Sequence, residues 1–429
     1  MRNSRSLFVT FLPVIFLLAA AFCGAEVSLK SQAKEAFQAE QYPRALELLH
    51  RAQAQDSTDA EVYYLLGYYL HYLCYDSRPL SHYGRKQSDQ VIRHLRRALD
   101  LDPSLGNARY FLGAEYGARA RFALLHNDIQ GMKRELRNGY EAGGYPPWLL
   151  EYNRNILRSA ATNAILFVGG DAEATTLEYL QTVRGVRPDV TIIPGALLHR
   201  PWFVERLKSG LPGVFPPAPV SIATDQIRAL RPYKWRTDTL KIPIPDSLQE
   251  QWNLTGEQFT WVLEPDLTQE ARNRPMLSAG AAVLADIIQT NAWDRPVYFS
   301  LGMPRWMMAG LEDFTQLNGL TLKLVPVDSL PPESAIDAEV TEGVLTNPEN
   351  YADIRTVLRQ DMPRVNRLLV NYVAATLQLG RYYRRHGMSD RLGRLRKLYE
   401  STLTPEVIPA IRTFRPEIDR IIHNGEPAE

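Results

Sequence analysis

Two glycines and an aspartate follow directly after an apolar run, and they are the best candidate for a binding site in the sequence. Gly169, Gly170 and Asp171 come after residues 164–168, Ala-Ile-Leu-Phe-Val, which are typical of a buried strand. Glycine lets the backbone turn tightly, and the N-terminus of a following helix favours an anion. We therefore select six candidate ligand-binding residues near the expected strand ends. These residues are Gly169, Gly170, Asp171, Thr175, His199 and Ser300.

Asp171 also belongs to the one carboxylate pair that we would test for catalysis, as a general acid and base with Glu173 or Glu178. A plain turn is the structural alternative for Gly-Gly-Asp. The sequence has no G-x-G-x-x-G fingerprint, phosphate loop, H-E-x-x-H zinc motif or G-x-S-x-G elbow. Its 8 histidines are scattered, and Cys74 is the only cysteine beyond residue 25. We therefore assign no catalytic residue, no metal site and no cofactor.

The elements that position these residues form an α/β domain, which we expect over residues 150–330. Residues 164–168 and 190–193 are expected strands, joined by a helix over 175–183 with Thr175 or Thr176 near its N-cap. A strand, helix and strand at this spacing predict parallel pairing of the two strands.

Three further elements complete this domain. We expect a helix over 279–290, a strand over 296–300 and another strand over 320–325. The stretch 201–269 is rich in Pro, Trp and Tyr, and is interpreted as an insertion with small β elements. Ligands of open parallel sheets bind outside the carboxyl ends of the strands, so we expect the candidate residues to share one hollow there.

Residues 28–145 show the self-similarity of tetratricopeptide repeats. Ala33 to Gly67 spans the period of about 34 residues, and Asp102-Pro103 ends a second copy because proline cannot continue a helix. Such arrays present concave surfaces, so we expect a protein partner. The insertion at 72–88 is rich in Tyr, His and Arg. It is either a ligand loop or a helix extension that packs against the next domain.

The first 25 residues have the pattern of a secretory signal peptide, with Arg2 and Arg5 before an apolar run and small residues before Glu26. We expect export, to the periplasm or cell envelope, with an uncleaved anchor as the alternative. No later stretch is apolar enough to span a membrane. The 49 basic residues balance 48 acidic ones, which argues against a nucleic-acid partner.

The C-terminal segment, residues 331–429, begins with a linker at Pro331-Pro332. Two helices are expected after it, over 365–384 and 392–403, with Gly387 between them. The expected fold is thus α plus α/β. A tetratricopeptide-like helical array is followed by a mostly parallel α/β sheet domain and a C-terminal helical pair.

Two blocks of the α/β domain resemble a known family. The first contains residues 165–171, 177–181 and 185–190, and the second is Asn-Ala-Trp-Asp-Arg-Pro-Val-Tyr-Phe at 291–299. They resemble the soluble C-terminal region of a bacterial membrane-protein family of unknown function, which is related to protein O-mannosyltransferases. The resemblance covers residues 150 to 400. It implies a soluble domain that accompanies glycan chemistry.

Two departures from that family bear on function. The family has a Gly-Asp-Asn-Asp-Thr-like turn where this chain has Gly-Asp-Ala-Glu-Ala at 170–174, so that Asp171 matches and the polar residues after it are partly replaced. The multi-pass membrane half of the family, which carries the catalytic acid, has no counterpart in this sequence. The resemblance therefore implies a free-standing accessory domain and argues against glycosyl transfer by this chain alone.

Three functional hypotheses follow from the sequence. The first is a non-catalytic binding or scaffolding protein of the cell envelope, which binds a protein partner through its repeats and a glycan or lipid-linked sugar through its α/β domain. The alternative is a glycan-modifying transferase or hydrolase that uses Asp171 at a strand end. The third is a purely structural component of an envelope complex.

Overall fold

The computed structural model describes residues 28–269, 274–327, 330–354, 357, 365–409 and 411–423. The chain divides into two compact units, Met1–Gln55 and Asp56–Glu429. The first unit holds helices α1 (Leu29–Gln38) and α2 (Tyr42–Gln55), which pack against each other. Ala33 and Ala45 are fully buried in it, as small side chains at a close helix contact should be. The expected signal peptide, residues 1–25, lies outside the described residues.

The second unit begins with four helices that pack as the pairs α3 with α4 and α5 with α6. Their bounds are α3 (Ala60–His71), α4 (Arg85–Leu101), α5 (Gly106–Leu125) and α6 (Ile129–Glu141). A Cβ at Gly67 would come within 2.6 Å of the Leu95 side chain, so glycine lets α3 and α4 approach closely. These helices lie where the repeats predict helices. Their assignment as tetratricopeptide repeats stays a prediction.

A six-stranded sheet forms the centre of the second unit, in the order β11-β9-β10-β8-β1-β2. β1 pairs in parallel with β2, as the strand-helix-strand unit predicts, and also in parallel with β8. β10 is antiparallel to β8 and β9, whereas β11 is parallel to β9, so three of the five pairings are parallel. The strands are β1 (Ile165–Val168), β2 (Thr191–Pro194), β8 (Val297–Ser300), β9 (Thr315–Asn318), β10 (Thr321–Leu324) and β11 (Ile336–Asp337).

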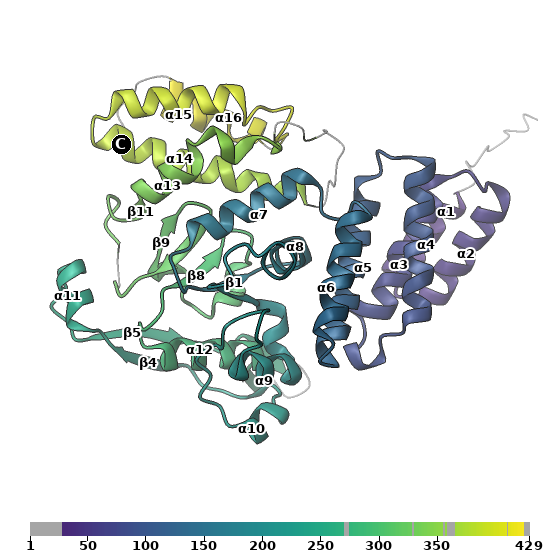
Figure 1. Cartoon of the computed structure of the whole chain (residues 1–429), viewed down its shortest axis with the longest axis horizontal. Coiled ribbons are helices and arrows are strands. Elements are labelled where there is room, and N and C mark those ends of the chain that lie inside the picture. The colour runs from purple at the N-terminus through teal and green to yellow at the C-terminus, as the bar shows by residue number, and fades with distance from the viewer. Residues whose placement is uncertain are drawn as a thin grey trace, which may run out of the picture. The chain divides into compact units, whose positions relative to one another are not determined.

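Alternate residues of β1 enter two different hydrophobic cores. Leu166 and Val168 join the core with α7 (Pro147–Ser159) and α8 (Asp171–Thr182). Ile165 and Phe167 join the other core, which contains α12 (Ala279–Asn291) and the inserted region. This is the alternation of a strand that is covered on both faces. Figure 1 shows α7 and α12 on opposite sides of the sheet.

The inserted region contains small β elements, as its composition predicts. They form a three-stranded sheet in the order β3-β7-β6 and the antiparallel pair β4-β5. The strands are β3 (Tyr233–Lys234), β4 (Asp238–Pro243), β5 (Gln258–Leu263), β6 (Leu267–Gln269) and β7 (Arg274–Leu277). The helices between these strands and before them are α9 (Pro201–Ser209), α10 (Thr224–Arg228) and α11 (Asp246–Trp252).

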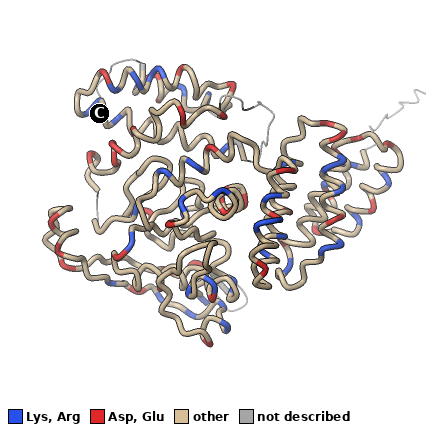
Figure 2. Tube along the Cα trace, viewed as in Figure 1, with Lys and Arg blue, Asp and Glu red and all other residues tan. Residues whose placement is uncertain are grey.

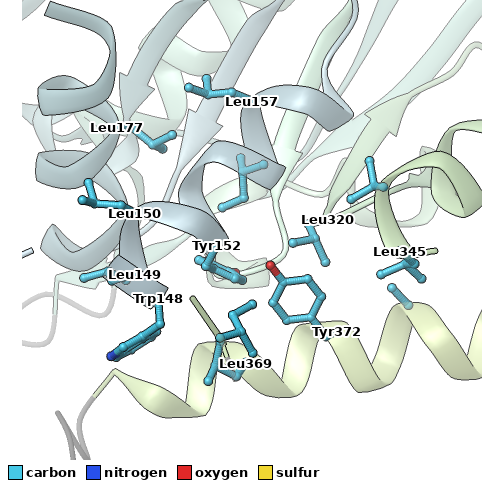
Figure 3. Packing of buried hydrophobic residues seen from close by; sticks show 14 of the residues in the cluster. Trp148, Leu149, Leu150, Tyr152, Leu157, Leu177, Leu320, Leu345, Leu369 and Tyr372 are labelled. Atoms are coloured by element: carbon cyan, nitrogen blue, oxygen red, sulfur yellow. The ribbon is translucent and has the colours of Figure 1, made fainter. Parts of the chain in front are cut away.

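The C-terminal helical pair is formed by α14 (Val370–Arg385) and α15 (Ser389–Ser401), which pack against each other. Helices α13 (Ala338–Leu345) and α16 (Ile411–Ile418) flank this pair in the chain. Tyr372 of α14 lies beside Tyr152 of α7 in the first core (Figure 3). Among the described residues, no helix is long and apolar enough to cross a membrane.

Candidate functional site

The turn after β1 shows why glycine occupies position 169. A Cβ there would come within 2.6 Å of the Gly302 carbonyl oxygen, because the ends of β1 and β8 approach closely. Gly170 then serves as the N-cap of α8, whose first residue is Asp171. The helix therefore begins four residues earlier than the expected start near Thr175. That prediction was wrong, because Thr175 lies inside α8 and is buried against α5.

Glu173 joins the ends of β1 and β8 from the first turn of α8. Its carboxylate accepts hydrogen bonds from Gly169 N (3.1 Å), Ser300 Oγ (2.6 Å) and Tyr152 Oη (3.1 Å), and the side chain is only 1% exposed. Burial raises the pKa of Glu173, and these hydrogen bonds oppose that rise. Ser300 is therefore a support for the turn and does not line the cavity beside it.

A cavity of about 210 Å³ opens at the carboxyl ends of β1 and β2. Three of the candidate residues line it, namely Gly169, Gly170 and Asp171. The other lining residues come from the segment after α3, from α5 and α8, from the end of β2 and the segment after it, and from α9. These residues are Tyr75, Asp76, Arg78, Leu80, Arg121, Ala174, Pro194, Ala196, Leu197, Arg200 and Trp202. The insertion at 72–88 thus contributes directly to this wall.

Arg121 of α5 anchors Asp171 at the cavity. Its Nη1 lies 2.6 Å from Asp171 Oδ1 and 2.7 Å from Tyr75 Oη, and the side chain is 3% exposed. Nε of Arg121 is 3.8 Å from Glu178 Oε1. Burial lowers the pKa of Arg121, but the neighbouring acidic groups raise it by more, so that the pKa lies well above its ordinary value. The guanidinium therefore keeps its charge. Asp171 is thus held in an ion pair, whereas Glu173 faces other partners.

Two further arginines give the cavity wall its free positive charge. The side chains of Arg78 and Arg200 are exposed, and neither has a hydrogen bond or ion pair within the described part of the chain. Basic and acidic residues are otherwise interspersed along the chain (Figure 2), so this positive charge is local. Trp202 adds an aromatic ring to the same wall. The cavity can therefore bind an anionic group beside a sugar-like or apolar ring.

A buried polar network supports the segment after α3. His71 Nδ1 lies 2.5 Å from Glu115 Oε2, and Tyr83 Oη donates a hydrogen bond to the other oxygen of Glu115. Burial lowers the pKa of His71, but the contact with Glu115 outweighs it and leaves the pKa above 6.5. His71 Nε2 is 3.9 Å from Asp76 at the cavity wall. The network thus connects the cavity to the interior of the helix pairs.

His199 does not line the cavity, although we predicted that it would belong to the site. Its Nδ1 accepts a hydrogen bond from Gly280 N at 3.2 Å, in the first turn of α12. A Cβ at Gly280 would come within 2.4 Å of the His199 ring, so this contact is tight. Burial lowers the pKa of His199. We conclude that His199 stabilises the junction with α12.

Arg187 and Arg295, which lie in the two sequence blocks that resemble the known family, stabilise the opposite end of the strands. Arg187 donates to the carbonyls of Leu157, Ala160 and Ala161 and pairs with Asp189. Arg295 donates to backbone carbonyls at positions 163, 164 and 217 and to a threonine hydroxyl at 191. These contacts involve the amino ends of β1 and β2. The sequence blocks therefore contain architectural residues as well as the cavity turn.

Sequence reasoning missed Arg121 as a site residue. Arg121 is a charged residue in a helix that is buried on nearly every side. A buried charge is stable only with a charged or hydrogen-bonding partner, and this requirement is the feature that could have identified Arg121 as a site residue. Within the described residues, no group of three or more His, Cys, Asp or Glu side chains is arranged to hold a metal ion. The cavity residues offer arginine and aromatic contacts instead.

The structure defines a class of protein with paired helices beside a mostly parallel α/β sheet and a polar cavity at the strand ends. Within this class, residues 150–270 and 235–340 match the model of TMEM260-associated domain 2. The protein O-mannosyl-transferase TMEM260 of Mus musculus is 33% identical over 64 residues, which are 15% of this chain and 9% of the mouse protein. The α/β region is thus related to that family. No solved structure is significantly similar to the chain.

The matched part spans less than one tenth of the length of the mouse relative. The relative comes from an animal, and the matches do not bear on the bacterial origin that the sequence resemblance implies. The two matches to the family model lie in the α/β region and extend beyond it to residue 340, so they include the turn at Gly170. The similarity therefore concerns the part of the cavity wall that the α/β region supplies, whereas Tyr75, Arg78 and Arg121 lie outside the matched residues.

Proposed function

We propose that the protein is an exported binding protein of the cell envelope, whose α/β region holds an anionic saccharide in the cavity at the strand ends. The observation that carries this proposal is the pair of exposed guanidinium groups, Arg78 and Arg200, in the cavity wall. Guanidinium groups bind phosphate and carboxylate through paired hydrogen bonds. A ligand anion would supply the partner that neither arginine finds in the described chain.

The size of the cavity favours a small ligand. Its volume of about 210 Å³ is below the range of roughly 300–1,000 Å³ that is usual for drug-sized ligands. One sugar ring with one charged group is of suitable size. The ring of Trp202 offers an apolar face, and the partly exposed carboxylate of Asp171 can accept a hydroxyl hydrogen. The name of the mouse relative, a protein O-mannosyl-transferase, supports a mannose-related saccharide.

Binding is favoured over catalysis by the partners of the acidic residues. Asp171 is in an ion pair with Arg121, and the carboxylate of Glu173 accepts hydrogen bonds from the ends of two strands. A general acid and base must both be free to exchange a proton with one substrate, and the carboxylate of Glu173 is buried and already accepts three hydrogen bonds. No particular contact favours the alternative, a transferase or hydrolase that uses Asp171. A glycan-modifying activity that Asp171→Ala abolished in a folded protein would support that alternative instead.

Isothermal titration calorimetry with mannose 1-phosphate, mannose and inorganic phosphate tests the proposal. We expect mannose 1-phosphate to bind more tightly than either fragment. Arg78→Gln and Arg200→Gln should each weaken its binding by about ten- to hundredfold, since a hydrogen bond to a charged group contributes about 1.5–3 kcal/mol.

Arg412→Gln is the matched control for this titration. Arg412 is exposed on α16 and does not line the cavity, so its replacement should leave the affinity unchanged. Equal affinity of the wild type, Arg78→Gln and Arg200→Gln would contradict the proposal. The absence of binding by all three compounds would also contradict it.

Export and a protein partner complete the proposal. The composition of residues 1–25 supports export, and the packed helix pairs supply a surface that a partner could contact. Mass spectrometry of the mature protein should find an N-terminus at or near Glu26. An intact Met1 in a cytosolic fraction would contradict export, and co-purification with one stoichiometric membrane protein would favour a structural role in an envelope complex.

A further inference from the structure

A second hollow, of about 390 Å³, borders the same turn as the first cavity. Gly170 and Asp171 line both of them. The second hollow is completed by residues of α5, of the first turn of α8 and of the segments after β8 and before α14. These residues are Tyr110, Ala172, Glu173, Gly302, Val365, Arg367 and Leu368.

The backbone between the two hollows is unobstructed. A Cβ added at Gly170 would have no heavy atom within 4 Å, so the turn presents open space at that position. Asp171 lies beside it, with a side chain that is 25% exposed. Arg121 engages Oδ1 of Asp171, and Oδ2 has no hydrogen bond in the described part of the chain. A ligand could therefore pass over Gly170 and donate a hydroxyl hydrogen to Asp171.

Each hollow has unpaired positive charge. Arg78 and Arg200 serve the first, and Arg367 lies in the wall of the second. The Arg367 side chain is exposed and makes no ion pair or hydrogen bond with the described residues. Guanidinium groups without an ion-pair partner among the described residues thus lie on both sides of the turn at Gly170. A ligand with a single anionic group would satisfy one side only.

We propose that the two hollows are adjoining subsites for one elongated ligand, an oligosaccharide with negatively charged groups on at least two of its sugar units. This inference rests on the binding function proposed for the first cavity. The second hollow lies within the usual volume range of ligand sites, roughly 300–1,000 Å³, and extends the space available to the ligand. Two linked contacts bind together with a high effective concentration, so affinity should rise with ligand length.

Galacturonic acid and its linear dimer, trimer and tetramer are suitable probes, because each sugar unit carries one carboxylate. Calorimetry with the full-length protein should show an affinity for the tetramer that exceeds that for the monomer by at least about tenfold. Arg367→Gln should lower the ratio of tetramer to monomer affinity to near one. Arg200→Gln should lower both affinities, and Arg412→Gln should change neither.

The outcomes separate this inference from the proposed function. Monomer binding without any gain for the tetramer would overturn the two subsites and leave the first cavity as a binding site. A tetramer gain that persists in Arg367→Gln would also overturn them, because the second cation would then contribute nothing. No binding of any anionic saccharide, mannose 1-phosphate included, would overturn both proposals together.

Discussion

Replacement of Glu173 by glutamine should destabilise the α/β region although it preserves the shape of the side chain. Gly169 N and the Ser300 hydroxyl donate to Oε2 of Glu173, and the Tyr152 hydroxyl donates to Oε1. If the new amide nitrogen takes the Oε2 position, the buried Gly169 N–H loses its acceptor. If it takes the Oε1 position, the hydroxyl hydrogen of Tyr152, which already accepts from Asn371, loses its acceptor instead. An unsatisfied buried group costs about 1–3 kcal/mol, and the free energy of unfolding should fall by that amount.

Urea unfolding, followed by tryptophan fluorescence, measures this loss. The midpoint should fall without a change in the slope of the transition, because the surface exposed on unfolding stays the same. Glu400→Gln is the control, since Glu400 is exposed on α15 and its ion pair with Arg396 contributes at most about 0.5 kcal/mol. A midpoint shift for Glu173→Gln that is no larger than the control's would refute the reasoning.

The pH dependence of stability gives a second measure of Glu173. Burial raises its pKa above the ordinary value of 4.5, so the folded protein keeps a proton that the unfolded chain releases. The contribution of Glu173 to stability should therefore fall as the pH rises from 4.5 through the folded-state pKa. Glu173→Gln should lack this component of the pH profile.

Four other substitutions extend the test to the rest of the fold. Contact with Glu115 raises the pKa of His71 above 6.5. The stability that His71 contributes should therefore be present below pH 6.5 and be lost as the pH rises through its folded-state pKa. Urea unfolding of His71→Gln should lack this loss. Gly117→Ala should cost about 1–3 kcal/mol, because its Cβ would come within 2.7 Å of a side chain of α8, whereas Gly343→Ala, which meets no neighbour, should stabilise by about 0.5–1 kcal/mol in thermal unfolding. Arg295→Lys should lower the free energy of unfolding by about 1–3 kcal/mol, because one ammonium cannot replace four hydrogen bonds; an unchanged urea midpoint would contradict this role.

The positions of the main strands were predictable because they depend on local pattern. Residues 164–168 form an apolar run that only a doubly covered strand can bury, and β1 is such a strand. A helix was predicted between β1 and β2, and a helical crossover joins parallel strands. The two strands do pair in parallel. The two C-terminal helices were predicted as a pair and are one, although α14 begins at Val370.

The start of α8 was mispredicted because the usual capping signal pointed elsewhere. Thr175 is a residue type that favours an N-cap, but α8 begins at Asp171 after Gly170, which offers no side-chain cap. Thr175 instead fits against Gly117 of α5, where only glycine leaves enough space. This contact joins residues that lie far apart in the sequence, so no local pattern could reveal it.

The sequence by itself determined the elements and the turn at Gly169, Gly170 and Asp171, because burial periodicity and glycine chemistry act over a few neighbouring residues. Only the tertiary structure decided what faces that turn. Arg121 reaches Asp171 from another helix, and Arg200 reaches the same cavity from the segment after β2. His199, which lies beside Arg200 in the sequence, contacts α12 instead. Adjacent side chains point in different directions, and the packing of distant helices determines which of them enters the cavity.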